Sequence, residues 1–298
     1  MLEIKNLKKL VKISEYTTYK IGGDADYFVI VKSKSELINA IIQARKNKIP
    51  FFILGSGANI LFGDKGFRGL VIKNEVKHIS VTNNIVTAGS GTTIAELIEN
   101  SMRIGLSGFE HFAGIPSTVG GALWQNLHFL LPDRTETVYI ESILKSAEIL
   151  DENNDLFKVG KDFFEFGYDK SILHKKDLVV TEATFHLQSK DAKKIRKQID
   201  ENLKWRDEKQ PSLEQFPSCG SVFKKIDGIG AGRLIDKVGL KGYQIGGAKV
   251  SEKHANFIVN TGGATANDVV DLIKLIQKKV FEETGHKLEI EINLVGEF

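Results

Sequence analysis

The chain has 298 residues, of which 42% are apolar and 27% charged, and its 41 Lys plus Arg against 38 Asp plus Glu leave a net charge of +3. This length can bury about two or three domain cores, and the balanced charge argues against a nucleic-acid coat or a polybasic membrane surface. The single cysteine excludes an internal disulfide, and the apolar runs are too short to span a membrane. We therefore expect a cytoplasmic protein that binds no nucleic acid and no membrane.

The first part of the chain alternates between strand and helix patterns. The apolar run at residues 27–31 predicts a buried strand, and apolar residues at helical spacing predict a helix over residues 34–48. A second apolar strand, at residues 49–54, leads into a Gly-rich loop.

The pattern changes at about residue 76. Residues 78–91 are strand-like, residues 93–105 predict a helix, and a second Gly-rich passage follows at residues 113–126. Two further strands are expected within residues 139–150 and 177–187.

A charged helix is expected from about Ala192 to Arg206, with Ile195, Ile199 and Leu203 facing the core. Its lysines alternate with Asp and Glu. This arrangement is typical of a solvated helix face and not of a nucleic-acid surface.

A polar linker with two prolines, at residues 208–219, precedes the last segment, in which helices are expected at residues 230–239 and 265–285. Strands and helices do not alternate with the strict rhythm of a doubly wound sheet, so we expect an α+β fold. The changes in pattern predict three domains, at residues 1–75, 76–207 and 208–298.

The first Gly-rich loop lacks the third glycine of a dinucleotide fingerprint, and a strand-like segment follows it instead of a helix. The backbone N–H groups of such a turn can still bind a phosphate, because no side chain blocks its approach. The alternative is a plain tight turn. The candidate ligand-binding residues here are Gly55, Ser56, Gly57, Ala58, Asn59 and Ile60.

The second Gly-rich loop has the features of a helix start. Pro116 suits the first turn of a helix, Ser117 and Thr118 supply hydroxyls, and two glycines permit close backbone approach. Two such loops in different parts of the chain predict one extended phosphate-bearing ligand between two domains. The candidate residues here are Gly114, Ile115, Pro116, Ser117, Thr118, Gly120 and Gly121.

Seven ordered motifs resemble those of the UDP-N-acetylenolpyruvoylglucosamine reductase (MurB) family. They are YKIGGDADYFV, ILGSGANILF, AGIPSTVGGA, SCGSVFKK, AGRLIDKVGLKG, IGGAKVSEKHANFIVN and LEIEINLVGEF. Each motif alone is weak, but together they span nearly the whole chain. The short stretch between DLVVTEATF and EKQP resembles the shorter subtype of the family.

The resemblance implies a two-part FAD-binding region of the vanillyl-alcohol-oxidase type, followed by a C-terminal α+β domain that covers the substrate. It implies FAD as the bound cofactor, NADPH as the reductant and a UDP-sugar enolpyruvyl ether as the substrate, in peptidoglycan precursor synthesis. In this family a hydride goes to the enolpyruvyl methylene carbon and the neighbouring carbon takes a proton. We expect a monomer, and no metal site, since the seven histidines show no paired ligand spacing.

Ser221 matches the proton donor of the family. A serine hydroxyl is a poor acid and needs neighbours that stabilise the alkoxide, for which Lys224 and Lys225 are candidates. The alternative role of Ser221 is to cap a Gly-Ser turn. Cys219 has no His-Asn or His-Asp pattern attached to it, so we expect a small buried residue there.

Further polar residues are assigned from the same resemblance. Glu291 matches the catalytic glutamate, although Glu289 lies on the same face of an alternating segment. Lys209 and Lys225 are candidate ligands of the anionic substrate, and His254 matches a substrate-facing position. The alternatives are exposed lysines and a structural histidine.

The chain departs from the family pattern at Asp169. The family has Tyr-Arg-x-Ser where this chain has YDKS, so a carboxylate replaces the arginine expected to stabilise the enolate. Either Arg233 or Lys224 substitutes for it, or the activity differs. The alternative function is therefore that of a related FAD-dependent oxidoreductase acting on a different small molecule.

A second departure follows the second Gly-rich loop. The segment LWQNLHFLLPDRTE replaces a small Asn-Ala-Gly continuation, although Asn126 keeps its place. We interpret the bulky Trp124, His128 and Phe129 as packing residues.

Overall fold

The computed structural model describes residues 2–133, 135–226 and 229–298. The chain divides into two compact units, each with its own hydrophobic core. Unit 1 comprises Met1–Leu7, Val29–Ser56 and Ile72–Arg206, and unit 2 comprises Lys8–Phe28, Gly57–Val71 and Asp207–Phe298.

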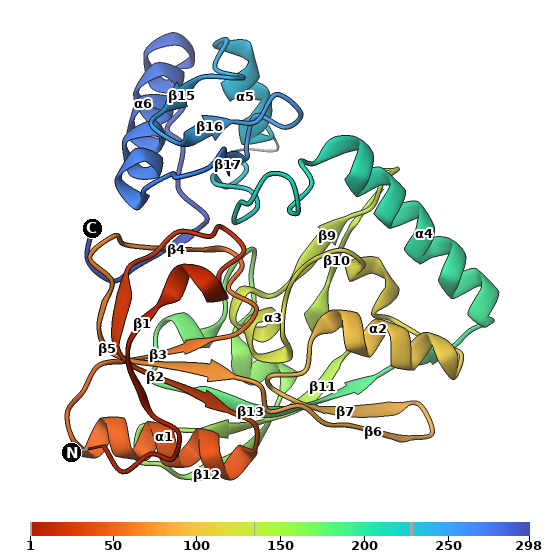
Figure 1. Cartoon of the computed structure of the whole chain (residues 1–298). Helices are drawn as coiled ribbons and strands as arrows, with labels where there is room; N and C mark the ends of the chain where they lie inside the picture. Colours follow the sequence, from red (N-terminus) through yellow and green to blue (C-terminus); the bar gives the residue numbers. More distant parts are fainter. Residues whose placement is uncertain (1, 134, 227–228) are drawn as a thin grey trace. The chain divides into compact units, whose positions relative to one another are not determined.

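The helices are distributed over both units (Figure 1). The α-helices are α1 (Lys34–Lys46), α2 (Ile94–Arg103), α3 (Val119–Gln125), α4 (Ala192–Lys209), α5 (Ala231–Lys237) and α6 (Ala266–Thr284). The short 3-10 helices are η1 (Ile13–Tyr16), η2 (Glu110–Phe112), η3 (Ile140–Ser142), η4 (Lys161–Phe164) and η5 (Ile172–His174).

The strands form several small sheets. They are β1 (Lys8–Lys12), β2 (Asp24–Val31), β3 (Phe51–Leu54), β4 (Ile60–Phe62), β5 (Phe67–Asn74), β6 (Ile79–Thr82), β7 (Ile85–Gly89), β8 (Leu106–Ser107), β9 (His128–Leu130), β10 (Thr137–Tyr139), β11 (Leu144–Leu150), β12 (Leu156–Gly160), β13 (Val179–His186), β14 (Gln188–Ser189), β15 (Gln244–Ile245), β16 (Ala248–Val250), β17 (Ile258–Asn260) and β18 (Asn293–Val295).

Unit 1 is built on an antiparallel sheet in the order β12-β11-β13-β7-β6. One face carries small core residues in register, with Ala183 opposite both Ala147 and Ala88, and Figure 1 shows α2 and α3 on one side of this sheet. The other face is polar, and Lys34 of α1 pairs there with Glu148 at 2.8 Å. This period-two alternation lets the single sheet support helices on both faces.

Unit 2 contains the C-terminal part of the chain. Helix α6 buries one apolar stripe and packs against the sheet β15-β16-β17 (Figure 1). Its N-terminus is capped twice, because Thr265 and Asp268 form a capping box and Asp64 accepts hydrogen bonds from the backbone of Ala266 and Asn267. Strand β18 pairs in parallel with β4, which joins the end of the chain to the segment after the first Gly-rich loop.

The α+β fold and most expected elements are confirmed, with one change at the charged helix. Helix α4 continues to Lys209, so Lys209 belongs to a helix and not to the linker. Leu203 was expected in the core but is 43% exposed, and Asn202 is buried instead. The amide of Asn202 donates to the carbonyls of Glu110 and His111, so a hydrogen-bonded polar residue takes the inward position.

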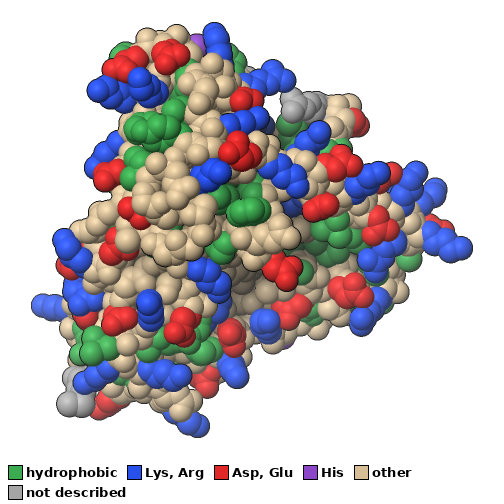
Figure 2. Space-filling model, turned by 45° about the horizontal axis from the view of Figure 1, so that its top comes forward, with side chains coloured by type: hydrophobic (Ala, Val, Ile, Leu, Met, Phe, Trp, Pro, Cys, Tyr) green, Lys and Arg blue, Asp and Glu red, His purple; other side chains and the backbone are tan. Residues whose placement is uncertain are grey.

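The surface is mixed in charge. Basic and acidic side chains are interspersed on the face in Figure 2. In the part of the chain that the structure describes, no helix is both long enough and apolar enough to cross a membrane.

Candidate functional site

The first two residues of the first Gly-rich loop, Gly55 and Ser56, lie in unit 1, directly after β3. A Cβ atom on Gly55 would lie 2.6 Å from the hydroxyl of Thr118, so the close approach of these two loops requires glycine there. The ammonium of Lys73 donates to the carbonyl of Gly55, and burial lowers the pKa of Lys73. A partly buried cation therefore lies at the point where the two Gly-rich segments meet within unit 1.

The start of α3 differs from the expectation. Thr118 is the N-cap, so Pro116 and Ser117 precede the helix instead of forming its first turn. The first three N–H groups of α3 are all used within the protein: Val119 donates to Thr92, Gly120 to Ser90 at 2.8 Å, and Gly121 to the Thr118 hydroxyl. These three donors are therefore satisfied within the protein, and the anion site expected at this segment stays a prediction for the other groups of the loop.

The second half of the first loop lies in unit 2 and does have available donors. Gly57 and Asn59 adopt left-handed backbone conformations, with φ of 70° and 56°. Within the described residues, no group accepts a hydrogen bond from the backbone N–H groups of Gly57, Ala58 or Asn59. Such a run of N–H groups is typical of an anion-binding turn, while Ile60 belongs to β4.

Arg206 is a residue that the sequence analysis did not select. Its side chain lies beside Gly114 in unit 1, where a Cβ would be 3.0 Å from Cδ and Nε of the arginine. Burial lowers its pKa to about 10, and among the described residues no acceptor is recorded for its guanidinium. A partly buried arginine without a counter-charge beside a Gly-rich turn points to an anionic ligand. Neither its place in a charged helix nor its residue type distinguishes it from its neighbours.

Ser221 and Glu291 come together in unit 2. Ser221 pairs with Phe257 in an antiparallel bridge, and the next residue, Val222, accepts a hydrogen bond from the backbone N–H of Glu291 at 2.8 Å. The side-chain amide of Asn59 donates to the Glu291 carbonyl at 3.4 Å. The candidate proton donor, the candidate glutamate and the donor-rich turn therefore lie on adjoining segments of one unit.

Asn256 holds this arrangement and was not selected from the sequence. Its side chain accepts a hydrogen bond from the Phe223 backbone N–H at 3.0 Å and donates to the Phe223 carbonyl at 2.8 Å. It is 7% exposed. The residue fixes the strand-like segment that carries Ser221.

Glu289 and Glu291 are separated by their surroundings. Glu289 is an exposed carboxylate, paired with Lys224 at 3.7 Å, whereas Glu291 is half-buried. The expected regular strand begins later, at Asn293, so the alternation of this segment is only local. Burial therefore separates the two carboxylates, and the role of Glu291 as the catalytic glutamate stays a prediction.

Cys219 is a buried residue, as expected, and is 4% exposed. Burial raises the pKa of its thiol well above the ordinary value, and the charge of Glu291 adds to the effect. The thiolate required of a nucleophile is therefore disfavoured. Of the two candidate nucleophiles, Ser221 is half-buried and Cys219 is enclosed.

The remaining candidates of unit 2 are placed as follows. Lys209 is exposed at the last residue of α4, and Lys225 is exposed beyond Ser221. His254 is half-buried, burial lowers its pKa, and its Nδ1 accepts a hydrogen bond from the backbone of Asn256 at 3.2 Å. Arg233, one possible substitute for the missing arginine, is exposed on α5.

The two departures from the family pattern meet in unit 1. Asp169 is buried, and His128 Nδ1 lies 3.6 Å from its Oδ1. Phe129 is a packing residue, as expected, with its ring edge-on to Trp205. Trp124 is 38% exposed and stacks on His174. Packing therefore accounts for Phe129. It does not account for Trp124, which is partly exposed, or for His128, which lies beside the buried Asp169.

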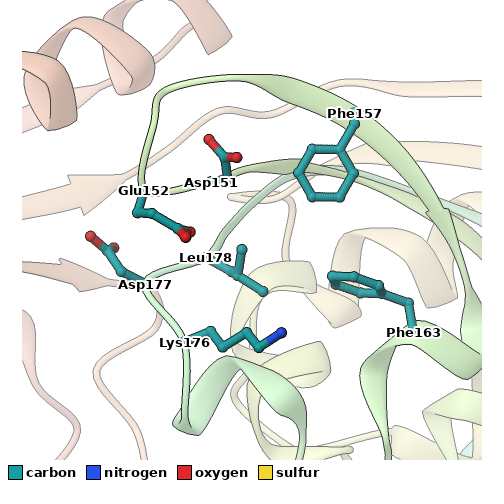
Figure 3. Close-up of a pocket in the computed structure, with 7 residues that line it drawn as sticks. All are labelled: Asp151, Glu152, Phe157, Phe163, Lys176, Asp177 and Leu178. Atoms are coloured by element: carbon teal, nitrogen blue, oxygen red, sulfur yellow. The ribbon is translucent and has the colours of Figure 1, made fainter.

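A separate pocket of about 440 Å³ lies in unit 1, at the end of β11. Figure 3 shows the carboxylates of Glu152 and Asp177 on one side and the rings of Phe157 and Phe163 on the other. Asp177 is engaged by Arg45 at 2.8 Å. None of the candidate residues lines this pocket. Over the described residues, no cluster of His, Cys, Asp and Glu side chains could hold a metal ion.

Two family models match the chain. Residues 25–160 match the family model described as FAD binding domain, and residues 210–295 match that of the UDP-N-acetylenolpyruvoylglucosamine reductase C-terminal domain. These matches and the α+β fold define a flavin-binding protein with an additional C-terminal reductase domain.

Curated relatives give the family. The UDP-N-acetylenolpyruvoylglucosamine reductase of Caldanaerobacter subterraneus subsp. tengcongensis is 41% identical over 96% of this chain and 92% of its own length. That of Clostridium perfringens strain SM101 is 40% identical over 95% and 91%. The crystal structure of the Thermus caldophilus enzyme superposes with a TM-score of 0.81 at 32% identity, covering 97% of this chain and 99% of that one. The chain belongs to the UDP-N-acetylenolpyruvoylglucosamine reductase (MurB) family.

Proposed function

We propose that the protein is an FAD-dependent reductase that uses NADPH to reduce UDP-N-acetylglucosamine enolpyruvate to UDP-N-acetylmuramate. The observation that carries the proposal is the meeting of Ser221, Glu291 and the Gly57–Asn59 turn on adjoining segments of unit 2. A proton donor, a carboxylate and an anion-binding turn are the groups that such a reduction needs from the protein.

The residues fit FAD through their unused donors. The turn formed by Gly57, Ala58 and Asn59 supplies backbone N–H groups, while Lys73 and Arg206 supply positive charge beside Gly55 and Gly114. We propose the turn of unit 2 as an anion-binding element for FAD, and we keep Lys73, Arg206 and residues 114–121 as candidate FAD-binding groups of unit 1. The residues before the helix would then line the flavin, namely Ile115, Pro116, Ser117 and Thr118.

When bound, FAD supplies the hydride chemistry, from NADPH to the enolpyruvyl methylene carbon. Ser221 provides the proton for the neighbouring carbon: its O–H bond breaks as the new C–H bond forms, and solvent returns the proton to the serine. Glu291 lies on the adjoining segment, where its carboxyl group assists this protonation. Lys209, Lys225 and His254 are assigned to the anionic substrate.

The proposal keeps the domain division 1–75, 76–207 and 208–298, with the third part as the substrate domain. It also includes a monomeric protein in the cytoplasm, where NADPH and nucleotide-activated sugars are available.

Anaerobic stopped-flow spectroscopy of the FAD-loaded protein tests the function. The yellow flavin absorbance should bleach with NADPH and return when the enolpyruvyl substrate is added, and mass spectrometry should detect UDP-N-acetylmuramate. UDP-N-acetylglucosamine, which lacks the enolpyruvyl double bond, is the matched control and should not restore the absorbance.

Asp169 is the observation that favours the alternative, a related oxidoreductase with a different small-molecule substrate. A carboxylate at this position would repel a negatively charged substrate. Bleaching by NADPH without recovery on addition of the enolpyruvyl substrate would support that alternative and overturn the proposed substrate.

A further inference from the structure

The pocket at the end of β11 lies outside the machinery assigned above. Its residues all belong to unit 1, and its volume is about 440 Å³. Volumes of about 300 to 1,000 Å³ are typical of small-molecule sites. One side of the pocket is charged and the other is aromatic (Figure 3). The pocket therefore suits a small molecule that has a polar end and an apolar end.

The aromatic side extends the core face of the five-stranded sheet to its edge. Phe157 of β12 lies opposite Ile149 of β11, which is fully buried. Strand β12 is the edge strand of this sheet, and Phe157 itself is 36% exposed. The ring of Phe163 meets that of Phe157 edge-on, with 5.9 Å between the centroids. A ligand that covered these rings would gain from removing their apolar surface from water.

The charged side is held in place by bonds within the protein. Arg45 of α1 donates to the two carboxylate oxygens of Asp177 at 2.8 and 3.2 Å. The carboxylate of Asp151 accepts hydrogen bonds from the backbone N–H groups of Asn153 and Asp155 at 2.9 and 2.8 Å. This side of the pocket is therefore formed before a ligand binds, and these two carboxylates already have partners.

Two charged side chains of the pocket have no such partners. Among the described residues, no hydrogen bond or ion pair is recorded for the carboxylate of Glu152 or the ammonium of Lys176. In Figure 3 the Glu152 carboxylate points toward Leu178, and the Lys176 ammonium lies on the side of the rings. The two charges are of opposite sign, so together they match a ligand that carries both a cation and an anion.

We propose that this pocket binds a small zwitterion of the α-amino-acid class with an aromatic or large apolar side chain. The ligand's ammonium group binds Glu152, its carboxylate binds Lys176, and its side chain packs against Phe157 and Phe163. A ligand with a single charge would leave either Glu152 or Lys176 without a partner. This site goes beyond the proposed function, because it uses no group assigned to FAD or to the enolpyruvyl substrate.

Calorimetric titration of the FAD-loaded protein with L-phenylalanine tests the ligand class. Saturable binding is expected with a dissociation constant of about 1 mM or below, a modest affinity because both charges are exposed to solvent. Phenethylamine lacks the carboxylate, phenylpropionate lacks the ammonium group, and glycine lacks the apolar side chain. Each should bind about 3- to 10-fold more weakly, since each loses one of the three contacts.

Substitutions at the two charges test the position of the ligand. Lys176→Met and Glu152→Gln should each raise the dissociation constant of L-phenylalanine by about 3- to 10-fold. Lys175→Met and Glu165→Gln are the matched controls, because these residues pair with each other at 3.5 Å and do not line the pocket. The controls should change the constant by less than about 2-fold, and flavin reduction by NADPH should keep its rate in all four variants.

The preference between ligands identifies the partner of the carboxylate. In Lys176→Met, L-phenylalanine should bind no better than phenethylamine, since its carboxylate has lost the ammonium that distinguishes the two ligands. This loss of preference is specific to a direct contact, and a general disturbance of the pocket would weaken both ligands alike.

Three results would overturn the inference: no saturable binding of L-phenylalanine, equal affinity of the wild type for phenethylamine, or unchanged affinity in both Lys176→Met and Glu152→Gln. The substituted residues are exposed, so folded variants are expected, and thermal unfolding checks this. The ligand series on the wild type decides even if a variant does not fold.

Discussion

Ser221 and Cys219 show how surroundings separate two nucleophilic side chains that are two positions apart. The thiol is enclosed, and burial raises its pKa, whereas the hydroxyl is half-buried beside the segment of Glu291. Burial disfavours the charged form of an acid. The Cys219 thiol, although intrinsically the stronger nucleophile, is therefore kept from forming the reactive thiolate.

Replacement of Ser221 by Ala tests its assignment as the proton donor. Flavin reduction by NADPH should keep its rate, while reoxidation by the enolpyruvyl substrate should slow by about 10²- to 10⁴-fold, the usual contribution of a positioned acid. Stopped-flow absorbance measures both steps. Ser218→Ala is the control, because the buried Ser218 hydroxyl has no hydrogen-bond partner among the described residues. Equal slowing of both steps would contradict the assignment.

Arg206 is a second residue whose surroundings indicate function. Arg206→Met should raise the dissociation constant of FAD by about 10- to 100-fold, because a charge-assisted contact with the pyrophosphate is lost. The apo-protein should unfold at the same or a higher temperature, since no internal partner is left unpaired. Quenching of FAD fluorescence and thermal unfolding provide the two measurements. Arg196→Met, at an exposed position of the same helix, is the control. Unchanged FAD affinity with a less stable apo-protein would show a structural role.

At the scale of elements, short irregular segments carry more of the site than regular ones. Residues 221–224 form bridges and single hydrogen bonds with residues 256–257 and 289–291, but none of these stretches is a regular strand at that point. The arrangement depends on side chains that bond the backbone, of which Asn256 is the clearest. Helix α3, by contrast, uses its first three N–H groups within the protein, two of them toward the carbonyls of Thr92 and Ser90, which ties the start of the helix to that loop.

Asn256→Ala should destabilise the segment that carries Ser221. Two hydrogen bonds to the Phe223 backbone are lost in a buried place, which predicts a decrease of about 2 to 4 kcal/mol in the free energy of unfolding. Denaturant unfolding followed by circular dichroism gives this value. Asn267→Ala, at an exposed position of α6, should change it by less than about 0.5 kcal/mol. Similar changes in the free energy of unfolding for the two variants would mean that the hydrogen bonds of Asn256 to Phe223 contribute no stability.

At the scale of the whole molecule, stability is divided between two cores. Both tryptophans, Trp124 and Trp205, lie in unit 1, so their fluorescence reports on that unit. Unit 1 also contains a buried carboxylate, that of Glu110 in η2. Its Oε1 lies 3.4 Å from the ammonium of Lys190, which precedes α4. Burial by itself raises the pKa of Glu110, but hydrogen bonds from Ser107 and Gly108 outweigh it, and the pKa lies below the ordinary 4.5.

A lowered pKa in the folded state means that Glu110 stabilises unit 1 above pH 4.5 and that this contribution is lost as the pH falls through the folded value. Glu110→Gln should therefore unfold at lower denaturant concentration at pH 7, with a loss of about 1 to 3 kcal/mol. The difference from the wild type should shrink as the pH is lowered toward 3. Tryptophan fluorescence in denaturant at several pH values measures it. A difference independent of pH would show that shape, and not charge, sets the cost of the substitution.

The amino-acid sequence by itself determined the elements and the family. Apolar periodicity placed α1, α2, α5 and α6, and seven motifs in order indicated the reductase family, because both are local properties of the chain. The Gly-rich loop at residues 55–60 was also visible as a turn able to bind an anion. The sequence could not decide between this anion-binding turn and a plain tight turn.

The tertiary structure decided which polar groups are already satisfied and which charges are enclosed. It showed that the first three N–H groups of α3 have acceptors within the protein, distinguished Glu291 from Glu289 by burial, and selected Arg206 and Asn256, which no local pattern marks. It also placed the carboxylate of Asp169 at 3.6 Å from the imidazole of His128. The physical reason is that burial and hydrogen-bond partners depend on residues far apart in the chain, and these set the charge state on which binding and catalysis depend.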